Sequence, residues 1–283
     1  ISGVLPVYNR PEKVRRAIDS VLNQTTSPKE ILITNDGSTD KTVEVLEEYA
    51  RNFPALIRCV EHRQNQGVSA SRNTAIKQAS GDWIALLDSD DEWLTEKLTQ
   101  QCNYHNQHPN LLLSQCNEIW IRNGNRVNKR DIHRKRGGCI FKASLKLCLV
   151  SPSAAIIHRS VFDEIGYFDE TMPACEDYDF WLRALVKYPI GFLDKNLVKR
   201  YGGHDDQLSA KYWGMDRWRV RAIEKHRHTD IPEDWKIALY EELINKLEVL
   251  YQGAAKRDKP EAKKYRQKIE RYRDNLRNLS VDS

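Results

Sequence analysis

Residues 83–93, WIALLDSDDEW, join an apolar run to a dense group of acids. The run WIALL has the character of a buried strand. Four of the five residues at positions 88–92 are acidic, namely Asp88, Asp90, Asp91 and Glu92. Carboxylates this close disfavour one another's ionisation. The sequence therefore predicts either a cationic partner that offsets the repulsion or a turn that carries the acids into water.

Strand-like and helical segments alternate on the N-terminal side of this stretch. Strands are expected at residues 2–8, 29–36, 57–62 and 82–91, and helical periodicity separates them at residues 10–24, 41–50 and 65–79. This alternation predicts parallel pairing and an α/β sheet. Such sheets bind ligands outside the carboxyl ends of their strands. Three polar groups fall at those ends: Tyr8-Asn9, Asp36-Gly37 and Asp88–Asp91.

The pattern changes after residue 92. We expect a helix at residues 93–109, a strand at 111–121, a polar and basic loop at 122–138, a strand and helix within 151–166, and a helix at 175–188. Two further helices are expected at residues 233–252 and after Pro260.

Composition narrows the class of protein. The chain has 283 residues, 40% of them hydrophobic and 30% charged, and no apolar run reaches the roughly 18–20 residues of a membrane-spanning helix. The start, ISGVLPVYN, has no basic leader, so we expect no signal peptide. The six cysteines form no C-x-x-C pair, which favours reduced thiols in a cytosolic protein.

The positive charge is concentrated near the C-terminus. The net charge is +5, and residues 256–277 contain ten Lys/Arg against four Asp/Glu. Such a segment suits an anionic partner or is a solvated helix face. Tyr265 and Tyr272 fall on its apolar stripe, so we expect no nucleic-acid binding.

The spacing Asp88-x-Asp90 indicates a metal site. Side chains alternate along a strand, so the two carboxylates lie on the same side of the backbone. Hard oxygen donors suit Mg²⁺ or Mn²⁺ together with a phosphate ligand. A calcium EF-hand loop fits poorly, because its sixth position would be Trp93 rather than glycine.

Six motifs together resemble a known family. They are LPVYNR (5–10), ITNDGSTD (33–40), NQGVSASRN (65–73), GDWIALLDSDD (81–91), CEDYDFWLR (175–183) and YGGHDDQLS (201–209). Their order is similar to that of family-2 glycosyltransferases, over roughly residues 2–225. The resemblance implies the GT-A fold, an α/β Rossmann-like fold with a mostly parallel central sheet flanked by helices. It also implies a glycosyltransferase domain at 1–228, with a nucleotide-sugar half at 1–100 and an acceptor half at 101–228, followed by a basic helical extension at 229–283.

The resemblance also assigns donor-binding residues. They are Pro6, Tyr8, Asp36, Arg72, Asp88 and Ser89. Asp36 would accept a hydrogen bond from uracil N3–H, which a carboxylate can do, although guanine N1–H would also satisfy it. Arg72 would contact the base or the diphosphate, since its guanidinium suits phosphate oxygens. Asn35 stands where many family members have an acid.

The remaining roles concern the metal and the chemistry. The implied ligands of Mn²⁺ or Mg²⁺ are Asp90, Asp88 and His204. Inverting transfer is a single displacement that needs a base for the acceptor hydroxyl and a cation at the leaving diphosphate. By resemblance Asp177 is that base and Glu176 its neighbour. Trp181 and Arg183 are expected to serve packing and a local ion pair.

The resemblance thus implies an inverting, metal-dependent glycosyltransferase. We expect it to move a sugar from a UDP-sugar to a glycan or lipid-linked acceptor in polysaccharide or cell-envelope synthesis, in the cytoplasm or on the inner face of the membrane. The C-terminal helices would serve membrane contact or self-association. The basic residues 129–136 form either a site for an anionic or lipid-diphosphate acceptor or a solvated loop. The alternatives are a nucleotidyltransferase, although YNRPEKV lacks that class's glycine-rich loop, and a non-catalytic nucleotide-sugar-binding module.

Overall fold

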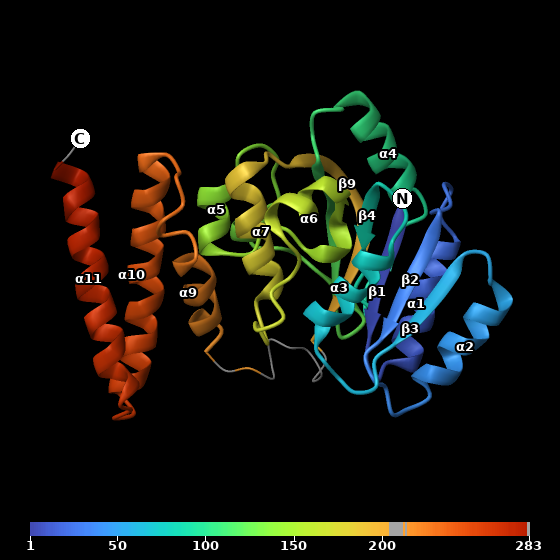
Figure 1. Cartoon of the computed structure of the whole chain (residues 1–283), viewed down its shortest axis with the longest axis horizontal. Helices are drawn as coiled ribbons and strands as arrows, with labels where there is room; N and C mark the ends of the chain where they lie inside the picture. The colour runs from blue at the N-terminus through green and yellow to red at the C-terminus, as the bar shows by residue number, and fades with distance from the viewer. Residues whose placement is uncertain (204–211, 213, 282–283) are drawn as a thin grey trace. The chain divides into compact units, whose positions relative to one another are not determined.

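The computed structural model describes residues 1–203, 212 and 214–281. Its first half confirms the predicted alternation (Figure 1). The elements are β1 (Ser2–Val7), α1 (Pro11–Leu22), β2 (Glu30–Asn35), α2 (Thr42–Asn52), β3 (Ile57–Glu61), α3 (Val68–Gln78) and β4 (Trp83–Leu86). The strand predicted at 82–91 is shorter than expected. Its acidic residues form a turn instead, in which the amide of Asp91 donates to the carbonyl of Asp88 at 3.0 Å.

One sheet gathers the strands in the order β3-β2-β1-β4-β8-β6-β9-β5, with β7 paired to β6. Strands β1 to β4 are parallel, and β1 lies between β2 and β4. Their carboxyl ends therefore share one edge, as predicted. Beyond β4 the sheet is mixed, because β8 (Ala155–His158) runs antiparallel to both β4 and β6 (Leu113–Arg122).

The far end of the sheet is built around a long strand. β9 (Gly191–Gly202) is parallel to β6 and antiparallel to the short strand β5 (Glu92–Trp93). Helix α4 (Lys97–Gln107) begins four residues later than predicted, because residues 92–93 form strand β5 and pair with β9. The segment expected as a loop at 122–138 also contains β7 (Asn125–Val127) and a 3-10 helix (Asp131–His133).

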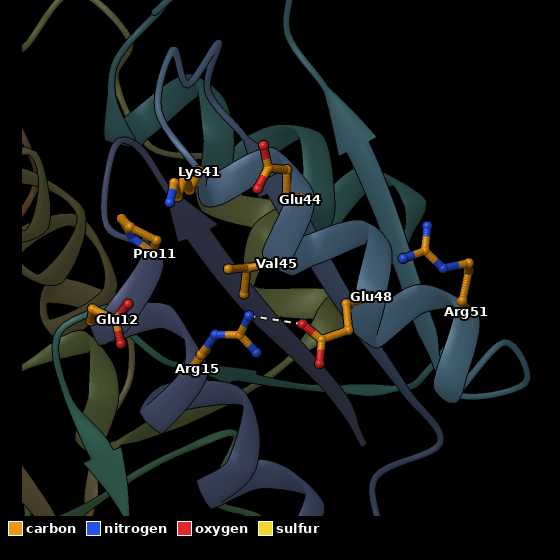
Figure 2. A pocket seen from close by; sticks show the side chains of 8 residues that line it. All are labelled: Pro11, Glu12, Arg15, Lys41, Glu44, Val45, Glu48 and Arg51. Atoms are coloured by element: carbon orange, nitrogen blue, oxygen red, sulfur yellow. Dashed lines mark hydrogen bonds and ion pairs between the residues drawn. The ribbon is translucent and has the colours of Figure 1, made fainter.

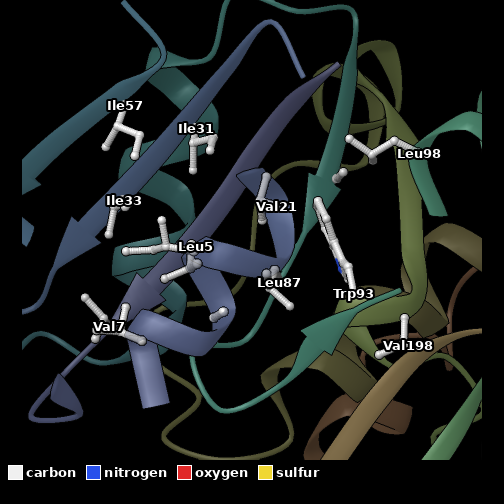
Figure 3. Close-up of a cluster of buried hydrophobic side chains, with 14 of the residues drawn as sticks. Leu5, Val7, Val21, Ile31, Ile33, Ile57, Leu87, Trp93, Leu98 and Val198 are labelled. Atoms are coloured by element: carbon white, nitrogen blue, oxygen red, sulfur yellow. The ribbon is translucent and has the colours of Figure 1, made fainter. Parts of the chain in front are cut away.

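Alternating apolar residues build the core beneath the first strands. Val14, Ile18 and Val21 of α1 are buried against Leu5 of β1 and Ile31 of β2, as Figure 3 shows in part. Full burial of such a side chain contributes about 1.5–3 kcal/mol. The core thus fixes the strands whose ends carry the polar groups.

The remaining elements are helical. They are α5 (Phe141–Lys146), a 3-10 helix (Pro152–Ala154), α6 (Arg159–Ile165), α7 (Glu176–Lys187), α9 (Asp216–Glu224), α10 (Glu233–Ala255) and α11 (Glu261–Val281). The two C-terminal helices confirm the prediction, and they lie side by side (Figure 1). Within the described ranges, no helix combines the length and apolarity that crossing a membrane requires.

The chain divides into two compact units. The sheet unit comprises residues 1–139, 149–173 and 188–204, and the helical unit comprises 140–148, 174–187 and 205–283. The helical unit therefore takes α5 and α7 from the middle of the sequence. The domains expected from the resemblance, residues 1–228 and 229–283, stay a prediction.

Candidate functional site

Three arginines contact the acidic turn after β4, and two of them pair with its carboxylates. Arg72 of α3 donates from its guanidinium to Asp88 Oδ1 at 2.7 Å. Arg10, just after β1, lies 2.8 Å from Asp90 Oδ2. Arg16 of α1 donates to the carbonyl oxygen of Asp90 at 2.6 Å. The predicted cationic partners of the acids are therefore present, and they come from separate elements.

Asp91 anchors the turn rather than facing a ligand. It is buried, its Oδ2 accepts from the Ser153 hydroxyl at 2.6 Å, and its Oδ1 accepts from the Tyr201 amide at 3.0 Å. Burial, followed by the charges of Asp90 and Asp88, raises its pKa well above the ordinary value. The same Ser153 hydroxyl accepts from the Asp88 amide at 3.1 Å. A buried Ser–Asp pair thus holds the two outer carboxylates in place.

Asp36 organises the loop that follows β3. Its Oδ1 accepts from the Gln66 amide at 2.9 Å and its Oδ2 from the Gly67 amide at 2.8 Å. His62 Nδ1 lies 2.7 Å from the same Oδ1, and Asp36 is 3% exposed. The carboxylate therefore already has several partners, and its predicted contact with a nucleobase stays a prediction.

The end of β1 is tied to the end of β2. The Asn9 amide donates to the Ser38 hydroxyl at 3.0 Å, and the Thr39 amide donates to Asn9 Oδ1 at 2.8 Å. Asn9 adopts the left-handed backbone conformation, with φ of 49°. Next to it Tyr8 is 42% exposed, whereas Pro6 is buried in β1. The exposed ring of Tyr8 can stack on a ligand. The buried Pro6 can only help to position the strand end that carries this ring.

We call Tyr8, Asp36, Arg72, Asp88 and Asp90 the strand-end site. The parallel strands bring all five to the same edge of the sheet unit, directly or through α3. Ser89, also predicted to bind the donor, is only 4% exposed, so its backbone is better placed than its side chain to meet a ligand.

The donor set of this site fits a hard divalent cation. Asp88 and Asp90 keep 28% and 15% of their side-chain surface exposed. Among the residues that the structure describes, no three potential metal-binding side chains gather in one place. Two carboxylates suit Mg²⁺ or Mn²⁺, which complete their coordination with phosphate oxygens and water. The third predicted ligand, His204, lies outside the described residues.

The predicted base lies in the helical unit, at the start of α7. Asp177 is half-buried, and its Oδ2 accepts from the Cys148 thiol at 3.7 Å. Glu176 is 5% exposed. Cys175 precedes them with φ of 60°, a value rare outside glycine that marks a constrained turn. Strain of this kind is typical of functional sites.

The packing role expected for Trp181 of α7 and the local ion pair expected for Arg183 are both confirmed. Trp181 is buried, and Arg183 pairs with Asp179 at 3.1 Å. Asp179 is fully buried, and it also contacts Lys225 of the helical unit at 2.5 Å.

Several residues of the site escaped sequence reasoning. Arg16 contacts the acidic turn across 74 residues of chain and Arg10 pairs with the same Asp90, while Ser153 supports the turn from the 3-10 helix before β8. Arg10 lies inside the quoted motif LPVYNR, so its position at a strand end was a usable signal. Nothing local marks Arg16 or Ser153, because their contacts depend on the tertiary fold.

The sheet unit also has a surface pocket that shares no lining residue with the strand-end site (Figure 2). It lies between α1 and α2, and its walls are Pro11, Glu12, Arg15, Lys41, Glu44, Val45, Glu48 and Arg51. Arg15 and Glu48 pair across it at 2.7 Å. The three basic and three acidic side chains balance one another, and no predicted site residue is among the eight.

Comparison with known proteins identifies the relatives of this chain. The sequence profile of glycosyl transferase family 2 matches residues 2–166. An uncharacterized glycosyltransferase of Rickettsia felis is 31% identical over 218 residues, covering 75% of this chain but 35% of its own length. The chain thus spans about a third of that relative. The Escherichia coli protein WfaP, a UDP-Glc:alpha-D-GlcNAc-diphosphoundecaprenol beta-1,3-glucosyltransferase, is 28% identical over 208 residues, which are 71% of this chain and 76% of WfaP.

Solved structures show the same fold. Staphylococcus aureus TarS 1-349 in complex with UDP-GlcNAc superposes with a TM-score of 0.71 at 22% identity, covering 98% of this chain and 89% of TarS 1-349. The mannosyltransferase PcManGT of Pyrobaculum calidifontis, in complex with GDP-Man and Mn²⁺, gives 0.61 at 17% identity, covering 99% and 85%. These likenesses establish the GT-A fold.

Proposed function

The chain belongs to glycosyl transferase family 2, and we propose that it transfers a sugar from a UDP-sugar to a hydroxyl of a glycan or lipid-linked acceptor, with inversion and with the help of Mn²⁺ or Mg²⁺. The pairing of Arg72 with Asp88 and of Arg10 with Asp90 carries this proposal. Each pair joins a group suited to a diphosphate with a group suited to a metal ion.

The ion pairs can be exchanged for ligands of the same charge. A bound diphosphate would accept hydrogen bonds from the two arginines. A bound divalent cation would then replace the arginines as the positive partner of Asp88 and Asp90. The arrangement therefore needs little reorganisation on binding, which favours affinity. The cation, when bound, neutralises charge on the departing diphosphate.

The other site residues take the remaining tasks. Tyr8 stacks on the base and Asp36 accepts from its imide N–H, for which the carboxylate retains lone pairs. Asp177 takes the proton of the acceptor hydroxyl as the new glycosidic bond forms and the nucleoside diphosphate leaves. UDP is favoured by the donor named for WfaP and by the ligand of TarS, and bacterial glycan synthesis is favoured by the acceptor named for WfaP.

A donor panel tests the proposal. Thermal shift and slow hydrolysis are measured with UDP-, GDP- and dTDP-sugars in the presence and absence of Mn²⁺. We expect UDP-sugars to give the largest Mn²⁺-dependent shift and to release sugar. Asp90→Asn should abolish the metal-dependent part of the shift, because the carboxylate charge that binds the ion is lost.

The matched control is Asp82→Asn. Asp82 is an exposed acid at the opposite end of β4, so its loss should leave the metal-dependent shift unchanged. A preference for GDP- or dTDP-sugars would refute the assignment of uracil to Asp36. An Asp90→Asn protein with an undiminished Mn²⁺ response would refute the metal site.

A further inference from the structure

A second charged group lies beyond the strand-end site. We call it the Glu118 cluster. It consists of Glu118, Trp120, Lys129, Lys135, Ser151 and Arg200, all in the sheet unit. Its members come from β6, from β9, from the segments on either side of the 3-10 helix Asp131–His133 and from the segment before β8.

The carboxylate at its centre is heavily engaged. Lys135 Nζ lies 3.0 Å from Glu118 Oε2, which also accepts from the Ser151 hydroxyl at 2.5 Å. The Trp120 indole donates to Oε1 at 2.7 Å. Burial raises the pKa of Glu118, but Lys135, Arg200 and these hydrogen bonds outweigh it and hold the pKa well below the ordinary value. Glu118 is thus held in its ionised form, with Lys135, Ser151 and Trp120 in direct contact with its carboxylate oxygens.

Lys129 and Arg200 lie farther from this carboxylate than Lys135 does, and Lys129 Nζ also donates to Asn117 Oδ1 at 2.9 Å. Lys129 Nζ and Arg200 lie 4.0 Å and 3.8 Å from Glu118 Oε1. Burial lowers the pKa of Lys129 to about 8; Glu118 raises it, and Lys135 and Arg200 lower it. Lys129 and Lys135 alone outnumber the single carboxylate, and Arg200 adds to them. The cluster therefore holds more positive charge than its own acid balances.

An aromatic ring lies beside Lys129 and Arg200. Lys129 Nζ lies 5.8 Å and the Arg200 guanidinium 5.7 Å from the centre of the Trp120 ring, which is half-buried. The side chain of Arg200 is 46% exposed and that of Lys129 18%. A ring flanked by two cations can hold a sugar face on its apolar surface and an anion at its edge.

The cluster adjoins the strand-end site through shared elements. Ser151 donates to Glu118, and Ser153, two residues later, donates to Asp91 of the acidic turn. On β9, Arg200 belongs to the cluster, and the amide of its neighbour Tyr201 donates to the same Asp91. A ligand bound at the cluster therefore lies beside the acidic turn.

We propose that Lys129 and Arg200, backed by Lys135 and Trp120, bind a phosphate or diphosphate group of the acceptor. This inference rests on the proposed function and deepens it, because it names an acceptor whose sugar is linked to phosphate. The donor also carries a diphosphate, so the test separates the two sources.

The probe is inorganic diphosphate, titrated calorimetrically into the full chain in metal-free buffer that contains saturating UDP. We expect diphosphate to bind although UDP fills the donor site. Lys129→Gln and Arg200→Gln should each weaken this binding about tenfold, the effect of losing one charge-assisted hydrogen bond. Lys195→Gln, which removes an exposed charge from the same strand as Arg200, should leave it unchanged.

Two results would overturn the inference. If diphosphate binds only when UDP is absent, it binds at the donor site. If both cluster variants bind diphosphate as tightly as the wild type, the Glu118 cluster is not the binding site. UDP-sugar hydrolysis by the wild type is measured in parallel. Its absence would refute the proposed function, whereas hydrolysis together with unaffected diphosphate binding would refute the acceptor inference alone.

Discussion

At the scale of single residues, Lys97 is a buried cation whose burial costs folding free energy. It is 0% exposed, and its Nζ forms no hydrogen bond within the described residues. The ammonium lies 4.2 Å from the centre of the Trp93 ring, a contact that offsets only part of the loss of hydration. Burial lowers the pKa of Lys97 to about 8.

We predict that Lys97→Met stabilises the protein. The pKa falls from 10.5 to about 8 on folding, which corresponds to roughly 3 kcal/mol of penalty on the charged form. Below about pH 8 Lys97 is protonated in both the folded and the unfolded chain, so the folded state carries the whole penalty. Between pH 8 and 10.5 the unfolded chain binds more protons than the folded chain, so the wild type gains stability as pH rises. Urea unfolding at pH 7 and pH 9.5 should show the advantage of the variant shrinking.

The control for this prediction is Lys264→Met, because Lys264 is exposed on α11. It should change the unfolding free energy by less than about 0.5 kcal/mol at either pH. An advantage of Lys97→Met that is the same at both pH values would mean that packing, rather than charge, causes the stabilisation.

Gly37 offers a second prediction at this scale. It has φ of +70°, and a Cβ there would lie 2.6 Å from the carbonyl carbon of Gln64. Gly124 has φ of +78° with nothing within 4 Å of its would-be Cβ. Both alanine variants bear the backbone strain, of about 1–3 kcal/mol. Gly37→Ala should lose clearly more stability in thermal unfolding and weaken UDP binding, since the clash displaces the loop held by Asp36. Equal losses in both variants would contradict this account.

At the scale of elements, hydrophobic periodicity predicted those helices and strands whose formation depends on neighbouring residues. The apolar period of Val14, Ile18 and Val21 places α1 correctly, and the alternation of strands and helices gives the parallel pairing of β1 to β4. Residues 82–91 were predicted as one strand because periodicity does not show that Asp88 begins a turn. The turn forms because Ser153 and Tyr201 provide partners for Asp91, and these partners are distant in sequence.

The start of α7 carries the prediction at this scale. Acids in the first turn of a helix are favoured by the macrodipole whether or not they act in catalysis. Asp177→Asn should abolish sugar transfer while the UDP-induced thermal shift persists, because the amide cannot accept the hydroxyl proton.

The matched control is Glu233→Gln, an exposed acid in the first turn of α10 within the same helical unit. It has the same relation to a helix dipole, so it should leave both transfer and UDP binding unchanged. Retained transfer in Asp177→Asn would show that this acid only stabilises its helix.

At the scale of the whole molecule, the sequence indicated the elements but not their grouping. Residues 140–148 and 174–187 belong to the helical unit although sheet-unit segments lie between them. Contacts such as Tyr178 hydroxyl to the Leu145 carbonyl at 2.5 Å and the stacked rings of Phe141 and Trp235 at 5.0 Å hold this unit together. Hydrophobic periodicity identifies buried faces, but it does not say which buried faces meet.

The basic C-terminal segment shows the same limit. Arg273 pairs with Glu248 at 2.6 Å, and Lys268 pairs with Glu224 at 2.7 Å. These two cations thus link α11 to α10 and α9, so part of the predicted anion-binding charge serves the fold. Membrane contact and self-association of these helices stay predictions.

Tyr272 of α11 tests whether the C-terminal helices are integral to the helical unit. It is 0% exposed, and its hydroxyl donates to Glu224 of α9 at 2.5 Å. Tyr272→Ala removes a buried ring and should destabilise the unit by about 3–5 kcal/mol, whereas Tyr272→Phe keeps the ring and should cost about 1 kcal/mol. Calorimetric unfolding with tryptophan fluorescence measures both. If the two variants unfold alike, the hydrogen bond to Glu224 rather than the buried ring fixes α11. If neither differs from the wild type, α11 is an appendage whose loss the helical unit tolerates.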